Sequence, residues 1–182
     1  SRYSGRLSSV LEVNLKDGNQ ERVKGSVSAG LPGFKAFLQG PISDKSTLLI
    51  GGRLSWVNFY IDSLIDKFTV FDDVDLNFHD FVAKYTYRFS NTSSFSISGY
   101  KGGDKLELEK NQTLPNDNGG SFNSQEQTSF GWGNELLSAR FSMVISPKLF
   151  LNVNAGVLDY DYRSKAAYTF VNVEGGQVIK ED

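Results

Sequence analysis

The chain has 182 residues, a mass of 20.2 kDa and a formal net charge of −2 from 19 basic and 21 acidic side chains. This length suits a single domain with a buried core, and a near-neutral chain without a basic block excludes the usual electrostatics of a nucleic-acid binder. The absence of cysteine excludes disulfides, thiolate metal sites and a cysteine nucleophile, the single histidine excludes a cluster of imidazole ligands, and no apolar run approaches the roughly 20 residues of a membrane helix.

The predicted strands come from a composition rich in residues that favour β-structure, with 14 Phe, 8 Tyr and 2 Trp, and with 18 Gly against 4 Pro. Seven segments alternate apolar and polar side chains with a period of two, which is typical of strands with two different faces. In chain order they cover residues 23–31, 34–42, 47–56, 81–89, 94–99, 137–145 and 149–157. An eighth strand is expected if residues 167–173 also pair.

The last of the seven strands changes its apolar phase near Leu158. Up to Val157 the odd positions are apolar, and from there Leu158, Tyr160 and Tyr162 take over. A β-bulge produces such a change, and so does a strand that leaves its apolar surroundings.

The connections are expected to be short at one end of the strands and long at the other. Residues 43–45, 91–93 and 146–148 predict tight turns, whereas residues 58–75 and 102–127 predict long loops. This pattern describes an up-and-down meander and is also what an outer-membrane barrel shows. The first hairpin, around residues 31–33, is the exception because it is short at the end where long loops are expected.

Alternation alone does not say which face of the strands is buried. A soluble barrel points its apolar face inward, whereas a membrane barrel turns that face to lipid and lines its lumen with the polar one. Three features favour the membrane arrangement: a polar phase of Ser, Thr, Asn and Gly with isolated cations, bulky aromatic residues at strand ends, and a long strand over residues 128–146. The residues predicted to lie at a membrane interface are Trp56, Tyr85, Tyr87 and Trp132. These features leave both arrangements open.

The opening stretch resembles the end of the plug domain of TonB-dependent outer-membrane receptors. It reads YSGRLSSVLEV over residues 3–13 and KDGN over residues 16–19, similar to a family pattern R-x-G-G-R-L-S-S-V-L-D-V-x-x-K-D-G-N, with Ser4 and Glu12 where Gly and Asp are common. Further matches follow in order: GPI at residues 40–42, GGR at 51–53, GWGN at 131–134 and SPKL at 146–149. The resemblance extends to about residue 163, and the order of these motifs makes it more specific than any one of them.

The resemblance implies an all-β fold, an antiparallel up-and-down meander from part of a transmembrane β-barrel. It implies that residues 1–20 end the plug domain with its last strand, and that residues 21–182 form the first seven or eight barrel strands. A complete receptor of this family has about 22 strands around its plug. The chain is therefore expected to be a fragment, with transport belonging to the whole protein.

The function implied by the resemblance is energised uptake of a scarce nutrient across the bacterial outer membrane, the nutrient being a siderophore, vitamin, glycan or peptide. The implied partners are outer-membrane lipid, the TonB complex through the rest of the plug, and the nutrient itself, with a surface lipoprotein as a further partner in some receptors. No cofactor and no nucleic-acid partner are expected.

Five residues are predicted to contact ligand from the lumen or from a loop, namely Arg53, Arg88, Arg140, Asp159 and Asp161. The arginines fall in the polar phase of three strands, where each either steers an anionic ligand or forms an ion pair with the plug. Lys84 belongs to the same set. The aspartates alternate with tyrosines and either line the lumen above the membrane or form cross-strand pairs.

No combination of residues points to catalysis or to a metal site. His79 lies near four aspartates, but their spacing does not match a calcium loop, and a solvated acidic loop beside a strand explains them. No acid–base pair or nucleophile arrangement is present, so an enzyme is not expected.

Two other classes of protein remain as alternatives. One is a small complete outer-membrane barrel of about eight strands with a structural role, whose first and last strands must pair. The other is a soluble ligand-binding barrel, in which four aromatic residues point into an enclosed cavity. Those residues are Phe81, Tyr85, Phe95 and Phe141.

Overall fold

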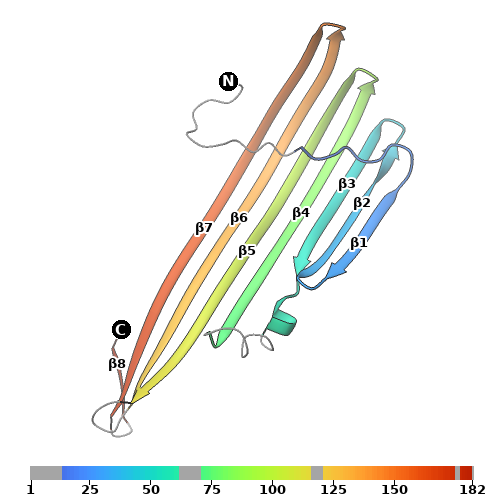
Figure 1. The fold of residues 1–182 in the computed structure, drawn as a ribbon. Helices are drawn as coiled ribbons and strands as arrows, with labels where there is room; N and C mark the ends of the chain where they lie inside the picture. Colours follow the sequence, from blue (N-terminus) through green and yellow to red (C-terminus); the bar gives the residue numbers. More distant parts are fainter. Residues whose placement is uncertain (1–13, 62–70, 116–120, 175–176, 182) are drawn as a thin grey trace.

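The computed structural model describes residues 14–61, 71–115, 121–174 and 177–181, and most of them form one antiparallel sheet with strands in the order β1 to β8 (Figure 1). The predicted all-β, up-and-down meander is therefore confirmed. β1 and β8 stand at opposite ends of the strand order and do not pair, so the sheet of these residues is open. Within the same residues, no helix is long and apolar enough to span a bilayer.

The strands lengthen along the chain, from 7 residues in β1 to 26 in β6 and β7. Their bounds are β1 Lys24–Gly30, β2 Gly33–Ser43, β3 Ser46–Ser55, β4 Asp73–Ser90, β5 Ser93–Pro115, β6 Ser121–Ser146, β7 Leu149–Glu174 and β8 Gln177–Glu181. At about 3.3 Å per residue, the two longest strands extend for roughly 85 Å.

Three two-residue turns lie together at one end of the sheet, the upper end in Figure 1. They connect β2 to β3, β4 to β5 and β6 to β7, as the sequence predicts. Each turn follows a one-residue shift in pairing, at 41/43, 88/90 and 144/146. We call this the turn end of the sheet, and the opposite end the loop end.

The strands toward the loop end are longer than the sequence predicts. Residues 102–127 do not form a long loop, because β5 continues to Pro115 and β6 begins at Ser121. The predicted eighth strand over residues 167–173 is likewise part of β7, and β8 comes later. Alternation of apolar residues stops where a strand loses its apolar surface, whereas backbone pairing with a neighbouring strand continues.

An extended segment of residues 14–22 crosses one face of the sheet near the turn end (Figure 1). We call it the crossing segment, the face that it covers the inner face, and the opposite face the outer face. The last plug strand predicted within residues 1–20 falls largely on residues 1–13, which lie outside the described residues. The described part, residues 14–20, forms no strand.

Four of the most buried side chains lie on the inner face, at the crossing segment. Three of them are polar, Thr47, Thr86 and Lys84 at 2–8% exposed, and the fourth is Leu49 at 3% exposed. Thr47 pairs with Thr86 and Leu49 with Lys84, so these four share the inner face. The polar phase of the alternation is therefore the covered one near the turn end.

The phase change at Leu158 occurs without a bulge, so the bulge explanation is wrong. Pairing between β6 and β7 runs without a shift from Ser121 to Val144, and Leu136 faces Leu158 within it. Leu158 lies on the same face as Asn154, which is four pairs closer to the turn end. The apolar residues therefore move from the outer to the inner face on unbroken strands.

Candidate functional site

The crossing segment is held to the inner face by charged and polar contacts from β4. Asp17 forms an ion pair with Lys84 at 2.8 Å and accepts a hydrogen bond from the Thr86 hydroxyl at 3.1 Å. The Lys84 ammonium also donates to the carbonyl oxygen of Leu15 at 2.8 Å. Because the Lys84 side chain is only 10% exposed, its charge depends on these oxygen atoms in place of water.

Two of the predicted arginines extend this contact. Arg88 lies 3.4 Å from the second carboxylate oxygen of Asp17, and Arg140 donates to the side-chain oxygen of Asn14 at 2.8 Å. Arg140 also donates to Asn154 on β7 at 2.7 Å. Of the two roles considered for these arginines, the structure shows contacts with the chain's own N-terminal segment.

The pKa of Asp17 lies below its ordinary value. Partial burial alone raises the pKa of this carboxyl, but hydrogen bonds from Lys84 and Thr86 and the charges of Lys84 and Arg88 together outweigh burial. The carboxylate is therefore ionised at neutral pH and acts as the central anchor of the crossing segment.

Gly18 allows the crossing segment to lie directly on the backbone of β3. A Cβ atom at this position would come within 2.6 Å of the Leu48 carbonyl oxygen and 2.9 Å of the Thr47 Cβ. Such distances are below van der Waals contact, so only glycine fits this close approach.

Arg53 is on the inner face as well, but it lies closer to the loop end, and its contacts are with β4. Its guanidinium pairs with Asp80 at 2.6 Å and lies 4.9 Å from the centroid of the Phe78 ring. Arg53 therefore belongs to a second group of inner-face side chains, beyond the crossing segment.

An exposed aromatic surface continues from this group across β5, β6 and β7. Tyr100 faces Leu136, Asp104 faces Trp132 and Trp132 faces Tyr162, all on the inner face. We call the following set the inner aromatic patch: Phe78, Tyr100, Trp132, Leu136, Leu158, Tyr160 and Tyr162. Trp132, Tyr160 and Tyr162 are 41–59% exposed, so their ring faces and polar atoms are available to a ligand.

Carboxylates border the inner aromatic patch at Asp80 and Asp104. Burial first, and then the negative charges of these two groups, raise the pKa of Tyr100, while Arg53 lowers it. The Tyr100 hydroxyl therefore stays protonated at neutral pH and can donate a hydrogen bond. The patch offers aromatic stacking together with a few hydrogen-bonding groups.

The outer face carries an exposed apolar band next to the turn end. On β6 and β7 the band covers residues 137–145 and 149–157, nine residues each. Its side chains include Ile97, Leu137, Ile145, Leu149, Leu151, Val153 and Val157, which are 40–73% exposed. Beyond Val157 this face becomes charged, starting with the row Lys101, Glu135 and Asp159.

Asp159 and Asp161 lie on a different face of the sheet from Arg53, Arg88 and Arg140. Asp159 faces Glu135 and Asp161 faces Gly133 on the outer face, while Arg140 lies on the inner face. Alternation along one strand could not place them relative to the arginines, because the neighbouring strands define the shared face.

The four predicted interface aromatics also lie on different faces. Tyr85 and Tyr87 belong to the outer apolar band, and Tyr87 contacts Phe89 edge-to-face at 5.0 Å. Trp56 stacks on Phe34 and donates its indole N–H to the carbonyl oxygens of Gly30 and Leu31, both at 2.9 Å. Trp132 lies on the inner face, opposite to the face of Tyr85 and Tyr87.

No group of three or more His, Asp or Glu side chains that could hold a metal ion occurs in the described part of the chain. His79 lies on the outer face opposite Leu54, while Asp80 points to the inner face and pairs with Arg53. The alternation of β4 thus separates the histidine from its nearest aspartate.

Sequence reasoning missed the role of Asp17 and the extent of the inner aromatic patch. The signal for the patch was present, because β5, β6 and β7 change phase at Tyr100, Leu136 and Leu158, which are aligned across the sheet. Comparison of the chain with protein families, with curated proteins and with solved structures finds no match.

Proposed function

We propose that the chain forms part of a TonB-dependent outer-membrane receptor, in which residues 14–20 end the plug and β1 to β8 belong to the barrel wall. The observation that carries the proposal is the arrangement of the two faces near the turn end. On β3 and β4 the polar face is covered by the chain's own N-terminal segment, while the apolar face is exposed. This is the reverse of a soluble barrel and the order expected when lipid surrounds the wall.

The dimensions of the apolar band support the proposal. Nine residues at about 3.3 Å each extend for roughly 27–30 Å, and tilted strands of 9–11 residues are the usual length for crossing a bilayer. The charged outer side chains beyond the band then lie outside the hydrocarbon region. The long parts of β5, β6 and β7 toward the loop end extend above the membrane in this arrangement.

The inner aromatic patch is the surface that we assign to nutrient contact. It lies on the same face as the crossing segment, on the side nearer the loop end, so a nutrient entering from outside meets it first. The alternatives find less support: the described strands do not close into a small barrel, and Phe81, one of the four aromatics of the soluble alternative, is 56% exposed.

The test is membrane insertion of the chain, expressed with the flanking segments of its reading frame. We expect the protein to fractionate with outer membranes and to resist carbonate extraction. Recovery as a periplasmic monomer that needs no detergent would refute the proposal.

A matched pair of substitutions tests the assignment of the faces. Val153 lies in the middle of the apolar band and is 51% exposed, whereas Asn152 is the adjacent residue on the inner face. We expect Val153→Lys to reduce the inserted fraction strongly, because a lysine at the bilayer midplane costs about 2–4 kcal/mol. Asn152→Lys should insert like the wild-type protein, and equal insertion of the two variants would contradict the assignment.

A further inference from the structure

The Asp104 carboxylate lies within the inner aromatic patch. On the inner face Asp104 is directly opposite Phe78 on β4 and Trp132 on β6, and Trp132 is itself opposite Tyr162 on β7. The Asp104 side chain is partly buried, and it forms no ion pair or hydrogen bond with another described residue. A carboxylate is therefore flanked by aromatic rings on both neighbouring strands.

A second carboxylate on the same face shows how this surface holds a cation. Asp80 pairs with the Arg53 guanidinium at 2.6 Å, and this guanidinium lies 4.9 Å from the centroid of the Phe78 ring. The arrangement suits a guanidinium, because its planar face stacks on an aromatic ring while its edge donates to a carboxylate. Asp104 and Trp132 offer the same combination of carboxylate and ring, with no cation supplied by the described part of the chain.

The charge of this part of the inner face favours a cationic ligand. Asp80 and Asp104 against Arg53, two carboxylates against one guanidinium, leave a net charge of about −1 at neutral pH. The other predicted arginines, Arg88 and Arg140, contact the crossing segment. An anionic nutrient would meet an uncompensated carboxylate at Asp104, whereas a cationic nutrient neutralises it.

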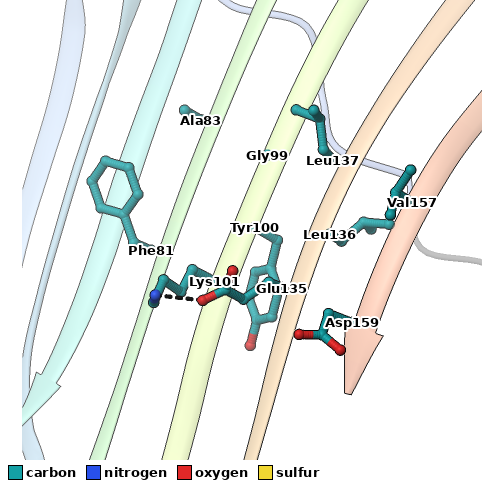
Figure 2. A pocket seen from close by; sticks show the side chains of 10 residues that line it. All are labelled: Phe81, Ala83, Gly99, Tyr100, Lys101, Glu135, Leu136, Leu137, Val157 and Asp159. Carbon is teal, nitrogen blue, oxygen red and sulfur yellow. Dashed lines mark ion pairs between the residues drawn. The ribbon is translucent and has the colours of Figure 1, made fainter. Parts of the chain in front are cut away.

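The Tyr100 side chain extends toward Asp104 along β5. In Figure 2 the hydroxyl end of the Tyr100 ring points down the sheet, in the direction in which β5 runs. A Cβ atom at Gly102 would lie 2.8 Å from the Tyr100 Cζ, so the ring passes directly over Gly102. Gly102 separates Tyr100 from Asp104 on the inner face. The Tyr100 hydroxyl therefore lies on the side of its ring nearer Asp104, where it is a hydrogen-bonding group for a ligand.

We infer that the inner aromatic patch binds a nutrient that carries a guanidinium group, such as an arginine-containing peptide. The guanidinium lies on the Trp132 ring and donates hydrogen bonds to Asp104, in the way that the chain's own guanidinium uses the neighbouring ring and carboxylate. The Tyr100 hydroxyl oxygen accepts a further N–H. The inference rests on the proposed function, because it requires this face to line the path of the nutrient.

The test uses the protein extracted from outer membranes in mild detergent and titrated with N-acetyl-argininamide or N-acetyl-citrullinamide. The two compounds have nearly the same shape, but citrulline has a neutral urea in place of the guanidinium. Trp132 is 41% exposed, so its fluorescence reports binding. We expect the arginine compound to bind about tenfold more tightly, the effect of one charge-assisted hydrogen bond. Affinities within about a factor of two would overturn the inference.

Two matched variants locate the preference. Asp104→Asn should lose most of it, whereas Glu135→Gln should keep it. Both variants remove one carboxylate, but Glu135 pairs with Lys101 on the outer face, as the dashed line in Figure 2 shows. A preference that is unchanged in Asp104→Asn, or equally reduced in both variants, contradicts the inference. The comparison of the two compounds on the wild-type protein remains decisive if Asp104→Asn does not fold.

A third variant and a third compound test the contact with the ring. The chain has two tryptophans, and Trp56 stacks on Phe34. Trp132→Phe should lose the fluorescence response, and a response that persists would place the ligand at Trp56 and refute the site. N-acetyl-lysinamide carries the same charge without a planar group, so it should bind more weakly than N-acetyl-argininamide. Equal affinities of these two compounds would refute the assignment to a guanidinium.

The fate of this inference can be separated from that of the proposed function. Carbonate extraction of the same membranes measures insertion without any ligand. A protein that inserts but does not distinguish the arginine compound from the citrulline compound refutes only the guanidinium site. A protein recovered without membranes refutes the proposed function itself.

Discussion

Replacing Asp17 with asparagine should release the crossing segment from the inner face. The variant loses the ion pair with Lys84 at 2.8 Å and the longer contact with Arg88 at 3.4 Å. Breaking a buried pair from one side costs about 3–5 kcal/mol, whereas an exposed pair contributes about 0.2–1 kcal/mol. Lys84 is 10% exposed and Asp17 is 47% exposed, and Lys84 keeps its bond to the Leu15 carbonyl. We therefore expect a loss between these limits, about 1–2 kcal/mol.

The assay is limited proteolysis with trypsin on the folded protein. Lys16 and Arg22 are exposed residues at the two ends of the crossing segment, and cleavage after them requires the segment to open locally. A loss of about 1–2 kcal/mol corresponds to cleavage faster by roughly 5–30-fold in Asp17→Asn. Asp44→Asn, in the exposed turn between β2 and β3, is the matched control and should leave the cleavage rate unchanged.

Acid should have the same effect on the wild-type protein. Because the pKa of Asp17 is lowered in the folded state, the ion pair contributes fully above the ordinary aspartate pKa of about 3.9. The contribution of the ion pair is lost as the pH falls through this lowered pKa. The reason is that the Asp17 carboxyl has a higher pKa in the released segment, so protonation favours release. Hydrogen exchange of the segment amides should show this loss below about pH 4 in the wild-type protein.

In the proteolysis assay, Lys84→Met removes the other partner of the ion pair. If trypsin cleaved both Asp17→Asn and Lys84→Met at the wild-type rate, the reasoning would be refuted.

Three further substitutions probe other contacts, and the free energy of unfolding in detergent measures each of them. Gly18→Ala should destabilise the protein by about 1–3 kcal/mol, because its Cβ would lie 2.6 Å from the Leu48 carbonyl oxygen. Trp56→Phe should cost about 1 kcal/mol, because it removes the indole donor of two hydrogen bonds at 2.9 Å but keeps a ring. Arg53→Met should cost less than about 1 kcal/mol, because its pair with Asp80 is half-exposed. A loss above 2 kcal/mol for Arg53→Met, or none for the other two, would contradict these assignments.

The sequence by itself determined the presence of seven strands, though not the full length of β4 to β7, together with the tight turns and the antiparallel meander. A period-two alternation and short turns are local properties, and they depend only on neighbouring residues. The segments from Leu48 to Leu54 and from Leu149 to Val157 are examples, because each lies within the strand that its alternation predicts.

The tertiary structure alone decided which residues share a face and what covers that face. Trp132 is placed on the inner face by its pairing with Asp104, and Asp159 is placed on the outer face by its pairing with Glu135. Neither face could be assigned from the residue type alone. Asp17 likewise meets Lys84 and Arg88 across about 70 positions of the chain, and no local pattern encodes that contact. The physical reason is that side chains in a sheet contact the neighbouring strands, and the register of those strands is set by the whole sheet.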